Sequence, residues 1–170
     1  MAKRRRRASG ARKLLVTILL AVSAVALILY LTKGGGKIDN ANLGQVQINE
    51  VMTSNKGSVP DETGDFPDWI EVYNNTDSPL DISGFGLTDE LISAAKWTFP
   101  EGAVIPARGY LVVFCSGDPT RGTMHTPFKL SASDDVILSN VSGKVVDSIT
   151  LKPVTSGYSL GRGAEDTTDW

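Results

Sequence analysis

The chain has 170 residues and a formal charge of −2, from 17 basic and 19 acidic side chains. This length suits one ordinary domain with an appendage, and it excludes a TIM barrel, which needs about 250 residues. A single Cys excludes an intramolecular disulfide framework, and a single His excludes a His-rich metal site.

The charge is distributed unevenly along the chain. Residues 1–37 carry nine basic side chains and no acidic one, whereas residues 38–170 carry eight basic and all 19 acidic side chains, a net charge of −11. Such an acidic body repels phosphate backbones, so we expect no nucleic-acid partner.

The amino-terminal segment starts with a run of cations, Lys3–Arg7, and continues into Leu14–Thr32, which has nineteen residues without a charge, Pro or Gly. As a helix this stretch spans about 28 Å, close to the roughly 30 Å hydrocarbon core of a bilayer. A cleavable signal peptide has a shorter apolar region and a small-residue cleavage site, which Thr32-Lys33-Gly34 imitates poorly. We therefore expect an uncleaved transmembrane signal anchor over residues 14–32, with cleavage as the alternative.

The flanking charges predict the orientation of this span. Seven cations precede it and two follow it, so we expect residues 1–13 to be a basic cytoplasmic segment and residues 33–170 to be extracellular. Residues 33–45, rich in Gly and Asn, are typical of a flexible linker. The sequence thus predicts a single-pass protein of the cell membrane.

From residue 46 onward, short β-branched and aromatic runs alternate with clusters of Gly, Pro, Asn and Asp. This pattern predicts an all-β, antiparallel sandwich or barrel. Tyr110–Cys115 is apolar on both faces, which predicts a central strand covered on both sides. Trp69, Trp97 and Phe114 lie in strand-like runs, and we expect them in the core. The expected strands are Val46–Thr53, Asp68–Asn74, Gly86–Thr88, Lys96–Phe99, Tyr110–Cys115, Phe128–Leu130, Asp135–Ser139 and Lys144–Leu151.

Several segments of this body resemble the lamin tail domain, in an order and spacing that cover nearly all of residues 46–168. They are Ile48–Val51, Asp68–Asn74, Leu80–Gly84, Gly86–Asp89, Lys96–Pro100, Ile105–Val112, Phe128–Ser131 and Tyr158–Arg162. The likeness is to the bacterial exported versions, because no coiled coil precedes the domain. It implies an immunoglobulin-like β-sandwich over residues 46–170, used for adhesion or interaction, with no catalytic residue or cofactor of its own. The family pattern usually runs further, so we expect residues 46–170 to lack its C-terminal end and the chain to be a fragment.

The anchor and the resemblance together predict a membrane-anchored extracellular module for adhesion, or for recognition of a protein or cell-surface ligand, without enzymatic activity. The alternative is an accessory domain of a longer surface enzyme, such as a spore-coat-protein-H-like kinase, whose catalytic part lies beyond Trp170. A purely structural spacer is a third reading.

Few motifs point to chemistry. Cys115 lies in an apolar strand, where a buried thiol is the ordinary explanation, and we expect His125 to make a loop hydrogen bond rather than to activate it. Glycosylation patterns begin at Asn74 and Asn140, but this short pattern arises often by chance.

Four carboxylates, Asp61, Glu62, Asp65 and Asp68, crowd one expected loop. Oxygen donors at this density can hold Ca²⁺, although acidic surface loops are commonly just solvated. The sequence leaves both alternatives open, and we assign no metal or cofactor to the chain.

Glu50 and Glu71 are unusual for another reason. Period-two alternation puts Glu50 on a strand face with Ile48 and Met52, and it puts Glu71 between two aromatic residues. A buried carboxylate needs a cation or several hydrogen-bond donors, and Arg162 is the best candidate cation. We expect at least one glutamate to be substantially buried and to pair with Arg162 or accept backbone hydrogen bonds, in a structural role.

Overall fold

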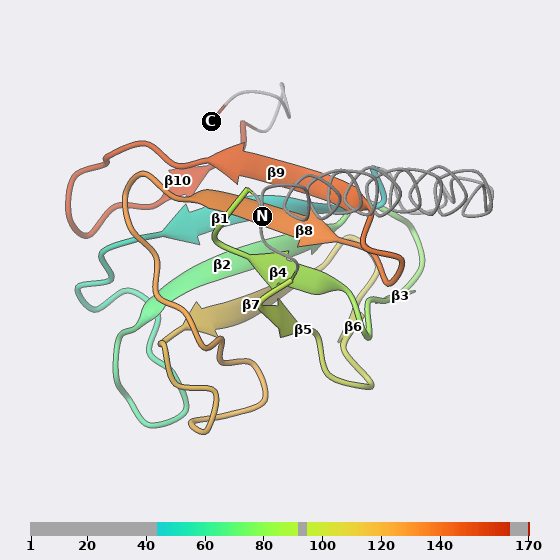
Figure 1. The fold of residues 1–170 in the computed structure, drawn as a ribbon, viewed down its shortest axis with the longest axis horizontal. Helices are drawn as coiled ribbons and strands as arrows, with labels where there is room; N and C mark the ends of the chain where they lie inside the picture. Colours follow the sequence, from blue (N-terminus) through green and yellow to red (C-terminus); the bar gives the residue numbers. More distant parts are fainter. Residues whose placement is uncertain (1–43, 92–94, 164–169) are drawn as a thin grey trace, which may run out of the picture. The chain divides into compact units, whose positions relative to one another are not determined.

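The computed structural model describes residues 44–91, 95–163 and 170 (Figure 1). The described residues belong to one compact unit, Ala41–Trp170. The expected cytoplasmic segment 1–13, the anchor Leu14–Thr32 and nearly all of the linker 33–45 lie outside the described residues. Within the described part of the chain, no helix has the length and apolarity that a membrane span requires.

The described residues fold into an all-β domain. One four-stranded antiparallel sheet has the order β10-β1-β2-β7, a second has the order β5-β4-β8-β9, and β3 pairs with β6. The strands are β1 (Val46–Met52), β2 (Asp68–Asn74), β3 (Leu80–Asp81), β4 (Gly86–Thr88), β5 (Trp97–Thr98), β6 (Val104–Ile105), β7 (Tyr110–Cys115), β8 (Asp135–Ser139), β9 (Val145–Thr150) and β10 (Leu160–Gly161).

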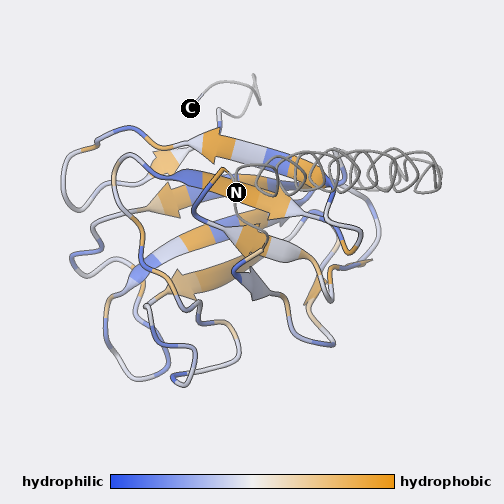
Figure 2. Ribbon diagram, in the orientation of Figure 1, coloured by the Kyte–Doolittle hydropathy of each residue, from blue (hydrophilic) through white to orange (hydrophobic). Residues whose placement is uncertain are grey.

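The two four-stranded sheets pack against each other through one hydrophobic core. Ile70 and Val72 of β2 are completely buried in it, as are Leu87 of β4 and Leu138 of β8. Figure 2 shows hydrophobic positions alternating with polar ones along several strands, as expected when one face of each sheet is covered. The predicted antiparallel β-sandwich is confirmed.

Most strands follow the sequence pattern. β2, β4, β7 and β8 have the expected bounds, and β1, β5 and β9 are one residue shorter at one or both ends. The two-residue strands β3, β6 and β10 were not anticipated, because so short a run carries little periodicity. The expected strand Phe128–Leu130 is wrong: Phe128 and Leu130 bury their side chains in the core, but their backbone belongs to a loop.

The prediction that Tyr110–Cys115 is a central strand is also wrong. β7 is the edge strand of its sheet, paired there with β2, and Tyr110 is 54% exposed. A loop covers the other end of this edge, where the Phe114 N–H donates to the Met124 carbonyl at 2.8 Å and the Thr126 N–H donates to the Phe114 carbonyl at 2.9 Å. The apolar run instead reflects cover on both faces of the strand, with Cys115 in the main core and Phe114 in a smaller cluster on the outer face.

Trp69 and Phe114 are buried, but outside the main core. With Met52 they form a second cluster on the outer face of the first sheet, and Val59 of the following loop packs onto it. Trp97 is partly buried and packs against the main core, as expected. The first sheet thus has apolar contacts on both faces.

The two glycosylation patterns have buried asparagines. Asn74 is completely buried, and its Nδ2 donates to the carbonyls of Ile105 and Pro106 at 3.1 and 2.9 Å. Asn140 is 6% exposed, and its Oδ1 accepts the Lys144 N–H at 3.0 Å. Both side chains stabilise turns, so neither amide is accessible to a sugar.

Candidate functional site

A charged cluster lies where the loop between β1 and β2 meets the loop after β7. Arg121 Nη2 contacts a carboxylate oxygen of Asp61, Oδ2 of Asp65 at 2.7 Å and the Thr63 hydroxyl at 3.0 Å. Asp61 Oδ1 accepts the N–H groups of Thr63 and Asp65 at 2.9 and 3.0 Å and the Thr63 hydroxyl at 2.8 Å. Burial opposes the charge of Asp61, but these hydrogen bonds outweigh it and lower the pKa of Asp61 to about 2.

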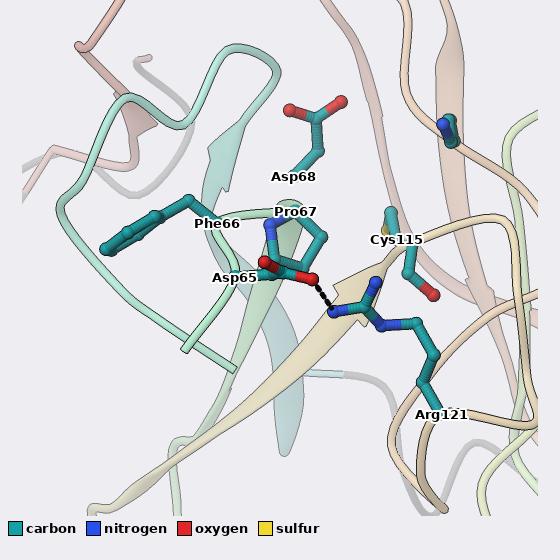
Figure 3. A pocket seen from close by; sticks show the side chains of 8 residues that line it. Asp65, Phe66, Pro67, Asp68, Cys115 and Arg121 are labelled. Atoms are coloured by element: carbon teal, nitrogen blue, oxygen red, sulfur yellow. Dashed lines mark hydrogen bonds and ion pairs between the residues drawn. The ribbon is translucent and has the colours of Figure 1, made fainter. Parts of the chain in front are cut away.

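A pocket of about 390 Å³ lies beside this cluster. Figure 3 shows Asp65 and Arg121 facing each other from two separate segments, with Phe66 to one side. Phe66 is 45% exposed, although aromatic rings of this size are usually covered. The lining residues are Asp65, Phe66, Pro67, Asp68, Cys115, Ser116, Arg121 and Lys129.

Two lining residues have shifted acidities. Burial raises the pKa of Asp68, against hydrogen bonds from the N–H groups of Asn55 and Leu130 and the nearby charge of Lys129. Burial also raises the pKa of Cys115, which is 1% exposed. The thiol therefore stays protonated, as expected for a structural cysteine.

His125 is completely buried next to this pocket. Its Nδ1 lies 3.0 Å from the Ser116 hydroxyl and its Nε2 lies 2.9 Å from Oε2 of Glu62. The ring stacks on Phe114 with 5.2 Å between the centroids. Hydrogen bonding to loops was expected of His125, and its partners are Ser116 and Glu62 rather than Cys115.

Serine, histidine and glutamate in series are also an order that nucleophilic catalysis uses. Here the Ser116 hydroxyl donates to the Asp118 carbonyl at 3.1 Å, so its proton is not directed at the imidazole. His125 is completely buried, and both of its ring nitrogens already have a partner, Ser116 or Glu62. These contacts favour a role for His125 in holding two loops together.

The four carboxylates of the acidic loop do not share one centre. Asp61 and Asp65 contact Arg121, whereas Glu62 contacts His125. Asp68, the fourth carboxylate, is the first residue of β2 and accepts backbone hydrogen bonds. A guanidinium therefore pairs with two of the four carboxylates, Asp61 and Asp65.

The sequence analysis missed Arg121 and Ser116. Ser116 and Arg121 lie 48 and 53 residues beyond Asp68, and the pairing of β2 with β7 brings the two segments together. The sequence signal that could have pointed to Arg121 is its positive charge within residues 38–170, which are mostly acidic.

Arg162 reaches β1, as expected, but with another partner. Its Nη2 lies 2.6 Å from Oδ2 of Asp147, and its Nε donates to the Ile48 carbonyl at 2.9 Å. The same Asp147 oxygen accepts the Ile48 N–H at 2.8 Å, so the ion pair satisfies both polar backbone groups of Ile48. The guanidinium also lies 4.5 Å from the ring centroid of Trp170. We call Ile48, Asp147 and Arg162 the Ile48 clamp.

Glu50 and Glu71 lie opposite each other on neighbouring strands, and both are partly buried. Among the described residues, neither forms an ion pair with Arg162; Glu50 accepts the Ser159 hydroxyl, and Glu71 accepts Asn49 Nδ2 at 2.8 Å. Burial raises the pKa of Glu71, the Asn49 hydrogen bond opposes this and the charge of Glu50 adds to it.

A β-bulge between Ile48 and Glu50 explains the difference from the expected pairing. Ile48 is completely buried in the main core, whereas Glu50 and Met52 pair across the outer face with Glu71 and Trp69. The extra residue reverses the alternation, so Glu50 lies on the outer face with Met52 instead of sharing the core face with Ile48.

Arg162→Ala would leave the Asp147 carboxylate without this cation and the Ile48 carbonyl without its donor. The two side chains are only 9% and 20% exposed, so we expect the free energy of unfolding to fall by about 3–5 kcal/mol. Urea unfolding measures this loss. The matched control is Arg108→Ala, whose ion pair with Asp77 is exposed and should contribute less than about 1 kcal/mol. Equal losses in the two variants would contradict the clamp.

Asp61→Asn should change how stability depends on pH. The pKa of Asp61 is lowered from 3.8 to about 2, so its charge stabilises the fold above about pH 4, and this contribution is lost as the pH falls toward 2. We therefore expect the variant to be less stable than the parent near neutral pH, and the difference to shrink below pH 4. Chemical unfolding at several pH values measures this. A difference that stays constant with pH would show that the Asp61 charge is unimportant.

Comparison with known proteins gives a family. Residues 39–153 match the family model of the lamin tail domain, and no curated protein matches the chain. The matched stretch contains β1 to β9 and both loops of the pocket, whereas β10 and Arg162 follow it. Because the match covers well over half of the sequence, the chain belongs to the lamin tail domain family.

Proposed function

We propose that this chain is a membrane-anchored extracellular module, of the kind that bacteria export, and that it recognises a protein or cell-surface ligand. The pocket between the loop 53–67 and the loop 116–130 is the observation that carries the proposal. It combines an exposed aromatic ring, Phe66, with charged side chains of both signs.

The composition of the pocket suits recognition. Aromatic and arginine side chains are enriched where proteins bind partners, and an exposed ring beside charged groups gives both contact area and orientation. Phe66 offers an apolar surface, and Lys129 is exposed at the pocket. We expect a ligand that covers the ring and offers an acidic group to Lys129.

The loops that form the pocket are held firmly. Asp61 is enclosed and receives four hydrogen bonds, and Asn55 Nδ2 donates to the carbonyls of Val59 and Pro67 at 2.7 and 3.0 Å. A loop that is already ordered loses less conformational entropy when it binds. This pre-organisation supports a binding role for residues 61–68.

The extracellular location rests on the uncharged run Leu14–Thr32 and on the seven cations before it. An acidic exported body is compatible with this location. The proposal contains no catalytic step, because His125 is enclosed and Ser116 directs its proton elsewhere.

The ligand proposal can be tested with the full chain in lipid nanodiscs and with cell-wall glycan or surface proteins as probes. We expect saturable binding that Phe66→Ala and Lys129→Glu each weaken by about tenfold or more. Tyr110→Ala is the matched control, because Tyr110 is also exposed but begins β7, at the other end from Cys115. An equal effect of all three substitutions, or no binding to any probe, would count against the pocket.

The anchor proposal has a separate test. Amino-terminal sequencing of the protein in the membrane fraction should find the residues before Leu14 still attached. A mature chain that begins near residue 35 would mean that the apolar run is a cleaved signal peptide.

A further inference from the structure

We propose that Asp61, Glu62 and His125 form a binding site for a divalent metal ion of the zinc type. Each side chain offers one ligand atom, and these atoms all lie within 4.8 Å of one another. Two of the residues lie on the loop after β1, and the third lies in the segment that bridges to Phe114 on β7. This inference is independent of the proposed recognition function.

One tautomer of His125 suits a cation at Nε2. A neutral imidazole has one N–H donor and one lone-pair acceptor. The Ser116 hydroxyl lies 3.1 Å from the Asp118 carbonyl and 3.0 Å from Nδ1 of His125. In the tautomer with the proton on Nδ1, the hydroxyl donates to the carbonyl and accepts from Nδ1. The Nε2 lone pair then faces Oε2 of Glu62 at 2.9 Å, and two acceptors oppose each other. In this tautomer a metal ion between the two atoms would bind both of them.

The geometry of the three residues suits a metal. Zinc ligands lie at about 2.0–2.2 Å, so two ligand atoms in a tetrahedral site are about 3.3 Å apart. The 2.9 Å between Nε2 of His125 and Oε2 of Glu62 is shorter than this spacing, and the three ligand atoms lie within 4.8 Å of one another. The side chains must therefore shift slightly to share an ion, and Glu62, which is 59% exposed, has room to do so. Its exposure also leaves access for a water molecule as the fourth ligand.

Contacts outside the ligand set support the same conclusion. Metal-binding histidines usually donate their other N–H to an oxygen that fixes the ring, and the Ser116 hydroxyl oxygen lies 3.0 Å from Nδ1 of His125, in position for this role. Asp61 Oδ2 accepts one hydrogen bond, from Arg121, and keeps a lone pair for a metal.

The local charge also favours a cation. Asp61 and Asp65 pair with the guanidinium of Arg121, and the third carboxylate, Glu62, contacts His125. A further carboxylate, Asp118, lies close enough to Arg121 for the charge of the guanidinium to contribute to lowering its pKa, after the larger effect of the Thr120 hydrogen bonds. With a neutral imidazole the cluster has an excess of negative charge that a divalent ion would largely offset.

The donor set selects the type of ion. Ca²⁺ and Mg²⁺ take oxygen ligands, whereas an imidazole nitrogen with two carboxylates suits Zn²⁺ and its neighbours. The site therefore differs from the calcium loop that Asp61, Glu62, Asp65 and Asp68 suggest in the sequence, because His125 replaces the last two carboxylates.

Calorimetric titration of the full chain, without a polyhistidine tag, with ZnCl₂ tests the site. We expect one ion per chain. Glu62→Gln should weaken binding by at least about tenfold, since even outer-shell partners of a metal contribute 10–100-fold. Glu101→Gln, which removes an exposed carboxylate from another turn, is the matched control and should bind as the parent does. His125→Gln should abolish binding, and its thermal unfolding shows whether the fold is kept.

Three outcomes would overturn the proposal. They are no saturable binding at millimolar Zn²⁺, equal affinity in the Glu62→Gln and Glu101→Gln variants, or binding of Ca²⁺ without binding of Zn²⁺. Because Glu62 is exposed, its variant should fold even where His125→Gln fails.

Discussion

The Ile48 clamp is the interaction on which the closure of the sandwich depends. β10 pairs with β1 only at Glu50 and Val51, so no strand accompanies the edge of β1 at Ile48. The Asp147 carboxylate and the Arg162 guanidinium take the place of that strand, one on the N–H and one on the carbonyl. Asp147 belongs to β9, so the same contacts join the first sheet to the second. A buried ion pair has a high desolvation cost, and these backbone hydrogen bonds help to offset it.

The parts of the fold that the sequence predicts are those where local alternation and burial agree. In β2, Ile70 and Val72 are completely buried while Glu71 and Tyr73 are not, as period-two alternation requires. β7 shows where the pattern misleads, because an apolar run indicates that both faces of a strand are covered but not whether a further strand pairs with its edge. The order of the sheets depends on contacts between distant segments, and no local pattern contains them.

β1 shows how one residue changes a site. The buried positions Val46, Ile48 and Val51 do not keep a single parity, and this break in spacing is the sequence signal of the bulge. Strict alternation places Glu50 with Ile48 and suggests Arg162 as its partner. The bulge instead leaves Glu50 beside Glu71, and Arg162 pairs with Asp147, a residue that alternation on β1 alone cannot identify.

The outer face of the first sheet links the scaffold to the site. Met52, Trp69 and Phe114 form a cluster there, away from the main core, and Val59 of the acidic loop packs onto it. On the same cluster, Phe114 stacks on His125. One small apolar cluster therefore supports both segments of the charged site, the acidic loop through Val59 and the histidine segment through Phe114. Trp69 therefore lies outside the main core because it belongs to the apolar cluster that supports two loops. Asp61 is held in place on this cluster, while Glu62 and Phe66 stay exposed.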